Sequence, residues 1–203
     1  MARRSDHTRE ELYEMALSTA REIVAAEGLR GLTARRVARE IGYSIGTIYN
    51  IFENFDDLII HLNATTLDRL YETATATPTE PDPGAALRAY ARCYFGFTSK
   101  NQRLWTAVFE HQLPDGYERP DWYHQKVAQL LSLAEDALAP FFAPDEAERR
   151  NHNARVLWSA LYGICSLAQS GSLRDDDSPT ELVDTLIENF LGGLRRSHSD
   201  AAG

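Results

Sequence analysis

The chain has 203 residues, of which 43% are hydrophobic and 25% charged, so it is globular and large enough for one domain or two small ones. Its net charge of −9 excludes a general affinity for nucleic acid, and any such contact has to come from a local basic patch. Cys93 and Cys165 stand apart, without metal-ligand spacing, which suits a reducing compartment. Since no apolar run approaches membrane-spanning length and no signal peptide opens the chain, we expect a cytoplasmic protein.

The first residues predict a basic arm followed by a helix. Residues 1–7 include Arg3, Arg4 and His7, which fits either a tail lying along DNA phosphates or a solvated terminus. Thr8 and Glu11 have the spacing of a capping box, in which each side chain bonds the other's backbone N–H. We therefore expect a helix to begin here and to end at Gly28.

Residues 33–52, TARRVAREIGYSIGTIYNIF, have the pattern of a helix-turn-helix. Thr33 and Ser44 are good N-caps for its two short helices, and Gly42 lies where the turn needs a positive φ. Ala38 is small, as required where two helices cross closely. The inward-facing apolar residues of the pair are Val37, Ala38, Ile41, Ile48, Ile51 and Phe52.

The second helix of this pair carries short polar and aromatic side chains that could reach base edges or phosphates in a major groove. Four arginines and one glutamate between residues 30 and 50 give this segment a local charge of +3. An ordinary helical pair with a solvated face is the alternative. The candidate DNA-binding residues are Thr33, Arg35, Tyr43, Ser44, Ile45, Thr47, Tyr49 and Asn50.

The segment GYSIGTIYNIFENFDDL, residues 42–58, resembles the recognition-helix signature of the TetR family of transcriptional repressors. The resemblance is close over residues 8–62. It implies a three-helix DNA-binding domain over 1–62 and an all-α domain over 63–203 that binds effectors and dimerises. One position departs from the family. Members usually have Lys at the start of the fourth helix, donating to a phosphate, whereas this chain has Phe55. The backbone N–H groups there could still bind a phosphate.

The remaining sequence predicts helices and loops without strands. Asn54 and Asp56 are candidate caps for a long helix that would join the two parts and act as a lever between them. The stretch 78–84 is a linker, and 113–121 is a loop. Ser178, Pro179 and Glu181 predict a last helix, which we expect to end near Arg196.

The last two predicted helices have apolar faces wider than packing within one domain requires. The Gly192–Gly193 pair permits close approach of another helix. Similar proteins form a four-helix dimer interface here, although a purely intramolecular core is the alternative. The candidate interface residues of a homodimer are Leu157, Leu161, Leu182, Leu186 and Phe190.

The middle of the chain is rich in large aromatic side chains, which together with a few polar groups could line a small-molecule pocket. Few acidic residues lie nearby, so we expect an apolar, aromatic or planar effector. For each aromatic residue taken singly, a place in the core is the alternative. The candidate ligand-binding residues are Phe97, Trp105, Phe109, Trp122, Tyr123, Trp158 and Tyr162.

An enzyme is disfavoured, because none of the six histidines has a zinc-site spacing and no glycine-rich phosphate loop is present. We expect no cofactor, no metal and no catalytic residue. The sequence and the resemblance together predict a dimeric repressor that a small ligand releases from double-stranded operator DNA. Two alternatives stay open: a TetR-like DNA-binding protein without an inducer, and an α-helical enzyme with an appended helix-turn-helix.

Overall fold

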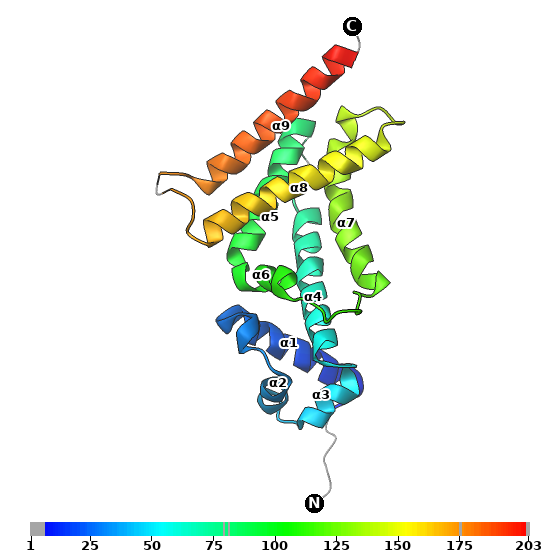
Figure 1. Ribbon diagram of the computed structural model, residues 1–203, viewed down its shortest axis with the longest axis vertical. Helices are drawn as coiled ribbons and strands as arrows, with labels where there is room; N and C mark the ends of the chain where they lie inside the picture. The colour runs from blue at the N-terminus through cyan, green and yellow to red at the C-terminus, as the bar shows by residue number, and fades with distance from the viewer. Residues whose placement is uncertain (1–6, 79, 81, 175, 202–203) are drawn as a thin grey trace, which may run out of the picture. The chain divides into compact units, whose positions relative to one another are not determined.

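The computed structural model describes residues 7–78, 80, 82–174 and 176–201, and these residues form helices without strands (Figure 1). The predicted all-α fold class is confirmed. The elements are α1 (Arg9–Glu27), η1 (Leu29–Gly31), α2 (Ala34–Glu40), α3 (Ile45–Ile51), α4 (Phe55–Thr75), α5 (Pro83–Lys100), α6 (Gln102–Glu110), α7 (Asp121–Leu138), η2 (Ala139–Phe141), α8 (Ala147–Gln169) and α9 (Pro179–Ala201).

The helices form two compact units. The first contains the chain up to Asp68 together with Asn101–His124, and the second contains Arg69–Lys100 and the chain from Gln125 onward. The assignment of α6 to the first unit is unexpected, because its sequence position follows the linker. The first unit is thus built from α1, η1, α2, α3, most of α4, α6 and the first turn of α7.

The capping box predicted for α1 is confirmed. The Thr8 hydroxyl accepts from the Glu11 N–H at 3.2 Å, and the Glu11 carboxylate accepts from the Thr8 N–H at 2.6 Å. Gly28 ends the helix with φ of 76°, a left-handed conformation that glycine adopts with little cost. The arm predicted over residues 1–7 falls outside the described residues, apart from His7.

The turn between α2 and α3 is also as predicted. Thr33 accepts a hydrogen bond from the Arg36 N–H at 3.1 Å and so caps α2. Gly42 has φ of 79°, and the N–H of Tyr43 donates back to the Ala38 carbonyl at 2.8 Å. Ser44 occupies the N-cap position of α3 but makes no side-chain cap bond; its hydroxyl lies 3.3 Å from that of Thr47.

The core of the first unit joins the helix-turn-helix to α4 and α6. Ile48, Phe52 and Leu58 are at most 1% exposed and share one cluster with Leu104 and Ala107 of α6. Buried Asn63 of α4 donates to the Ala107 carbonyl of α6 at 3.2 Å, and the same carbonyl also accepts from the His111 N–H at 3.3 Å. Helix α6 therefore packs as part of the same core as the helix-turn-helix.

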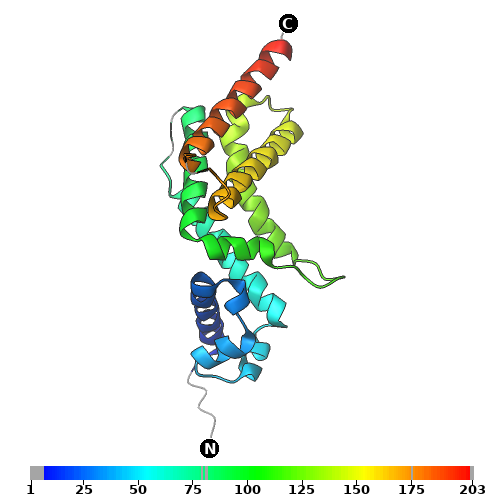
Figure 2. The same ribbon diagram turned by 60° about the vertical axis from the view of Figure 1, so that its left-hand side comes forward.

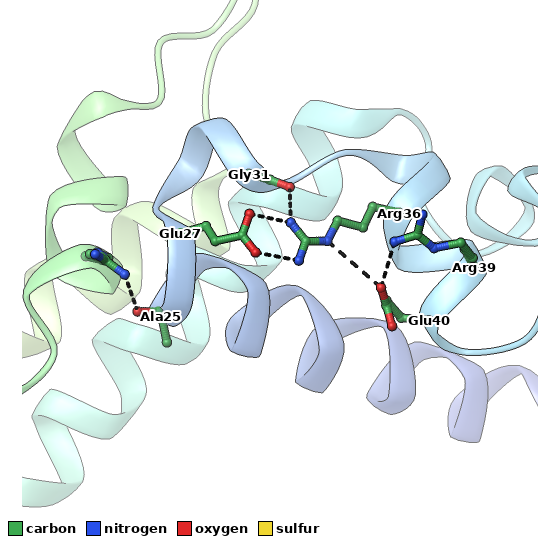
Figure 3. Close-up of polar contacts among 7 residues, drawn as sticks. Ala25, Glu27, Gly31, Arg36, Arg39 and Glu40 are labelled. Carbon is green, nitrogen blue, oxygen red and sulfur yellow. Dashed lines mark hydrogen bonds and ion pairs between the residues drawn. The ribbon is translucent and has the colours of Figure 1, made fainter.

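A charged clamp holds the end of α1 against α2 (Figure 3). Both terminal guanidinium nitrogens of Arg36 donate to the Glu27 carboxylate, each at 2.6 Å, and one also donates to the Gly31 carbonyl at 3.2 Å. The hydrogen bonds from Arg36 lower the pKa of Glu27. This bidentate geometry fixes the angle at which α2 enters the helix-turn-helix.

The second unit is a bundle in which α5 packs against both α8 and α9 (Figure 2). The Arg92 guanidinium of α5 donates twice to the Asp184 carboxylate of α9, at 2.8 and 2.6 Å. Helix α9 begins at Pro179 as predicted, with Ser178 accepting from the Glu181 N–H at 3.4 Å, but it continues to Ala201, past the predicted end. Within the described part of the chain, no helix is long and apolar enough to cross a membrane.

Candidate functional site

Helix α3 presents a neutral, partly apolar face to solvent. Ile45 is 40% and Tyr49 49% exposed, and Gly46 and Asn50 are exposed beside them. Thr47, in contrast, is only 8% exposed, so its prediction as an outward-facing DNA contact is corrected. The reason is the helical period: positions 45, 46, 49 and 50 share one face, whereas Thr47 shares the other with buried Ile48.

Tyr43, at the turn before α3, is half-buried and meets the end of the N-terminal arm. Its hydroxyl lies 2.7 Å from Nδ1 of His7, and the two rings are edge to face with centroids 5.9 Å apart. The sequence shows a basic arm but gives no signal for this contact, because 36 residues separate the partners. The contact fixes the position of the Tyr43 ring beside α3.

The cations around α3 differ in their availability. Arg36 is held by Glu27, and Arg39 pairs with Glu40 at 2.9 Å while remaining 73% exposed. Arg35 is exposed and takes part in none of the ion pairs between described residues. Thr33, also exposed, uses its hydroxyl to cap α2. Arg35 is therefore the cation of α2 best placed for an external anion.

A small-residue crossing, a glycine turn and an exposed second helix define a helix-turn-helix DNA-binding protein. Comparison with known protein families identifies the family of helix-turn-helix proteins to which the chain belongs. Residues 16–62 match the model described as bacterial regulatory proteins, tetR family, and residues 87–190, just over half of the chain, match that of a tetracyclin repressor-like C-terminal domain. The chain belongs to the TetR family of DNA-binding, non-enzymatic transcriptional regulators, which dimerise through the C-terminal domain.

Solved structures share this fold at low sequence identity. A protein of unknown function from Rhodococcus sp. RHA1 is 22% identical, with a TM-score of 0.76 over 95% of this chain and 98% of that one. A tetR-family regulator from Streptomyces coelicolor is 16% identical, with a TM-score of 0.71 over 95% and 83%. The fatty acid degradation regulator FadR from Bacillus halodurans is 18% identical, with a TM-score of 0.61 over 90% and 96%. No curated protein sequence matches the chain.

Phe55, the departure from the family pattern, opens α4 and packs its ring partly against the core of the first unit. Asn54 caps this helix by accepting from the Asp57 N–H at 2.8 Å. The second predicted cap, Asp56, instead lies 2.8 Å from Nε2 of buried His111, at the end of α6. The start of α4 is therefore tied to α6 by an ionisable pair.

A second histidine joins α4 to α1 and to the first turn of α7. Nδ1 of His61 lies 2.9 Å from the Tyr13 hydroxyl, and Nε2 lies 3.5 Å from the Asp57 carboxylate. The imidazole also stacks on Trp122, with centroids 4.8 Å apart and an interplanar angle of 24°. Burial lowers the pKa of His61 below its ordinary value of 6.5, and the negative charge of Asp57 opposes this only in part.

This arrangement predicts that acid weakens the fold through His61. Because its pKa is lower in the folded state, the unfolded chain binds more protons, and stability falls as the pH drops below 6.5. The melting temperature should therefore decrease between about pH 8 and about pH 5. In His61→Gln this decrease should be smaller. An unchanged pH dependence in the variant would show that other groups cause the loss.

The seven aromatic residues predicted to bind a ligand are divided between the two units. Trp105, Phe109, Trp122 and Tyr123 belong to the first, and Phe97, Trp158 and Tyr162 to the second. Within the first unit, Trp105 and Tyr123 are each 3% exposed, and Trp122 contacts His61. In the second unit, Phe97 is 6% exposed, and Trp158 and Tyr162 stack on one another. Phe97, Trp105 and Tyr123 are thus buried, whereas the remaining four of the seven are half-buried.

A cavity of about 420 Å³ lies instead within the second unit, between the end of α4, the start of α5 and the end of α7. Its walls are mostly alanine, proline and leucine side chains, with Glu80 and Asp136 also present. Tyr90 closes one side; its hydroxyl donates to the Leu130 carbonyl at 3.1 Å, and burial raises its pKa. Sequence reasoning missed this cavity because small residues give no signal of a pocket.

Two of the predicted dimer residues, Leu157 and Leu161, are only 1% and 2% exposed within the single chain. They form the core of the second unit and leave no surface for a partner. The adjacent face of α8 exposes Val156 and Leu167, at 46% and 48%. The other three predicted residues, on α9, are half-buried: Leu182, Leu186 and Phe190.

We also searched the described residues for metal-binding groups and reactive cysteines. No group of three or more His, Cys, Asp or Glu side chains among them could hold a metal ion. Cys93 and Cys165 are both free; Cys165 is buried, which raises its pKa, and its sulfur accepts from the Thr98 hydroxyl at 3.4 Å.

Proposed function

We propose that the protein is a dimeric repressor that a small apolar ligand releases from its operator. The exposed face of α3 carries this proposal, since Ile45 and Tyr49 are large apolar residues that the fold leaves in water. In the dimer, two such helices would enter successive major grooves about 34–36 Å apart. Arg35 and Tyr43 would bind phosphates, and the arm containing His7 would lie beside them. Its site of action would be the cytoplasm.

For the dimer interface we propose matching stripes on α8 and α9. Val156, Ala160, Ile164 and Leu167 recur at helical spacing on α8, and all keep surface in the single chain. On α9 the stripe contains Leu182, Leu186 and Phe190. Small residues at Ala160 and Gly193 would allow close approach of the partner helices. Two stripes from each of two chains would make a four-helix interface.

For the ligand site we propose the cavity of the second unit. Its volume of about 420 Å³ is within the usual range for small-molecule pockets, and its walls are chiefly apolar. A neutral apolar ligand therefore fits better than an anion, because Glu80 and Asp136 would repel negative charge. Such a ligand would weaken DNA binding by its preference for the protein form that does not fit the operator.

The ligand proposal is tested by filling the cavity. In Ala89→Phe a benzyl group would occupy the space beside Tyr90, and binding of alkylbenzenes or aliphatic alcohols should be lost. For the wild type, a ligand at about 100 times its Kd should stabilise the fold by about 2.7 kcal/mol and raise the melting temperature. The same compounds should release operator DNA in a gel shift.

Ala128→Phe supplies the matched control, since Ala128 is exposed on α7 away from this cavity. It should keep both the thermal shift and the release of DNA. Ala89→Phe should bind operator normally, but the compounds should neither raise its melting temperature nor release it from DNA. If it responds to them like the wild type, the ligand binds elsewhere; if no compound acts on the wild type, the protein represses without an inducer of this class.

A further inference from the structure

The residues that α3 exposes have an unusual chemistry for a DNA-reading helix. From Ser44 to Phe52 the sequence holds neither an acidic nor a basic side chain. Its exposed face consists of Ile45, Gly46, Tyr49 and Asn50. The nearby cations Arg35 and Arg39 belong to α2. The positive charge of the motif therefore lies on α2, whereas the residues that could contact bases lie on α3.

The base edges of the major groove limit what this face can read. Guanine is recognised chiefly by arginine or lysine at O6 and N7, and cytosine by a carboxylate at N4. Helix α3 has neither type. Thymine presents a C5 methyl group to apolar side chains, and adenine presents N7 and N6 to asparagine or glutamine. Ile45 and Tyr49 match the first pattern, and Asn50 matches the second.

We propose that α3 reads A·T base pairs, with Ile45 and Tyr49 packing on thymine methyl groups and Asn50 bonding adenine. This specificity rests on the proposed function, in which α3 enters the major groove. Each half-site of the operator then has A·T pairs at the centre of its contact with α3.

Gly46 gives separate support for close contact at this face. A Cβ added there would meet only the Ser44 hydroxyl at 3.6 Å, an ordinary contact, and Gly46 is not among the glycines with positive φ. The fold therefore has no need of glycine in this helix, where it is less favourable than alanine. Its missing side chain leaves space between Ile45 and Asn50 for a base pair to approach the backbone.

The test begins with selection of binding sites from random duplex DNA by the full-length protein. The selected half-sites should contain A·T pairs at the positions that Ile45→Ala and Asn50→Ala alter. Thymines at those positions are then replaced by uracil, which pairs identically but lacks the methyl group. Each lost methyl contact should weaken binding by about fourfold, from the usual worth of a buried methylene group.

Substitutions of single residues show which side chain is responsible for the preference for thymine over uracil and for A·T over G·C. Ile45→Ala should bind thymine and uracil operators nearly equally, and Asn50→Ala should lose discrimination against G·C at one position. Arg35→Ala is the control: it should weaken binding to both operators and leave their ratio unchanged. Circular dichroism checks that each exposed-site variant stays folded.

The outcomes separate this proposal from the function on which it depends. G·C pairs at the α3 positions, or equal binding of thymine and uracil operators by the wild type, would overturn the A·T reading while leaving a sequence-specific DNA-binding protein. If no sequence is enriched at all, the proposed operator binding itself fails.

Discussion

Replacing Leu186 by glutamate is expected to give a monomeric protein that no longer binds its operator. Leu186 is half-buried on α9 in the single chain, within the stripe that we propose a partner chain covers. A carboxylate there would be buried without a partner in the dimer, at a cost of about 3–5 kcal/mol. Since one recognition helix alone holds a single half-site, loss of the dimer should also remove operator binding in a gel shift.

Sedimentation velocity at micromolar concentration measures the change directly. Ala128→Glu adds the same carboxylate at an exposed position of α7 and should remain a dimer that binds operator. Circular dichroism should show both variants helical. If Leu186→Glu sediments as a dimer, the proposed stripe is not the interface, and the partner chain covers another surface.

Tyr49→Ala is expected to weaken operator binding by about 1–3 kcal/mol, or roughly 5- to 150-fold in Kd, with little effect on stability. Tyr49 is 49% exposed on α3, so few of its contacts within the chain are lost on truncation. The affinity should be measured at one fixed salt concentration, because phosphate contacts make DNA binding steeply salt-dependent.

Tyr117→Ala is the control variant. Tyr117 is 66% exposed in the loop before α7, so this substitution removes the same side chain from a different surface. It should bind operator like the wild type. Equal affinities of Tyr49→Ala and the wild type would exclude Tyr49 from the interface and leave the base contacts to other residues of α3.

The sequence predicted the helix-turn-helix well because its determinants are local. The Thr8 capping box, the Thr33 cap and the positive φ of Gly42 each depend on residues within a few positions. Such signals act through nearby backbone groups and do not require knowledge of the tertiary fold. The same holds for the beginning of α9 at Pro179.

What the sequence did not predict depends on contacts between distant segments. Helix α6 joins the core of the first unit through partners such as Asn63, 44 residues from Ala107. The apolar face of α8 was recognised, but the sequence could not tell that Leu157 faces the chain's own core while Val156 faces outward. That division is set by where α5 and α9 pack, and hydrophobicity alone does not encode it.

Because Trp122 stacks on His61, the contact between α4 and the first turn of α7 can be followed by tryptophan fluorescence. An indole 4.8 Å from an imidazole changes its emission when the imidazole gains a proton or moves away. With Trp105 and Trp158 replaced by phenylalanine, the remaining Trp122 would be a single reporter within the first unit. Its emission, followed during titration with operator or with a ligand, would show whether the first turn of α7 stays on α4 when DNA is bound or released.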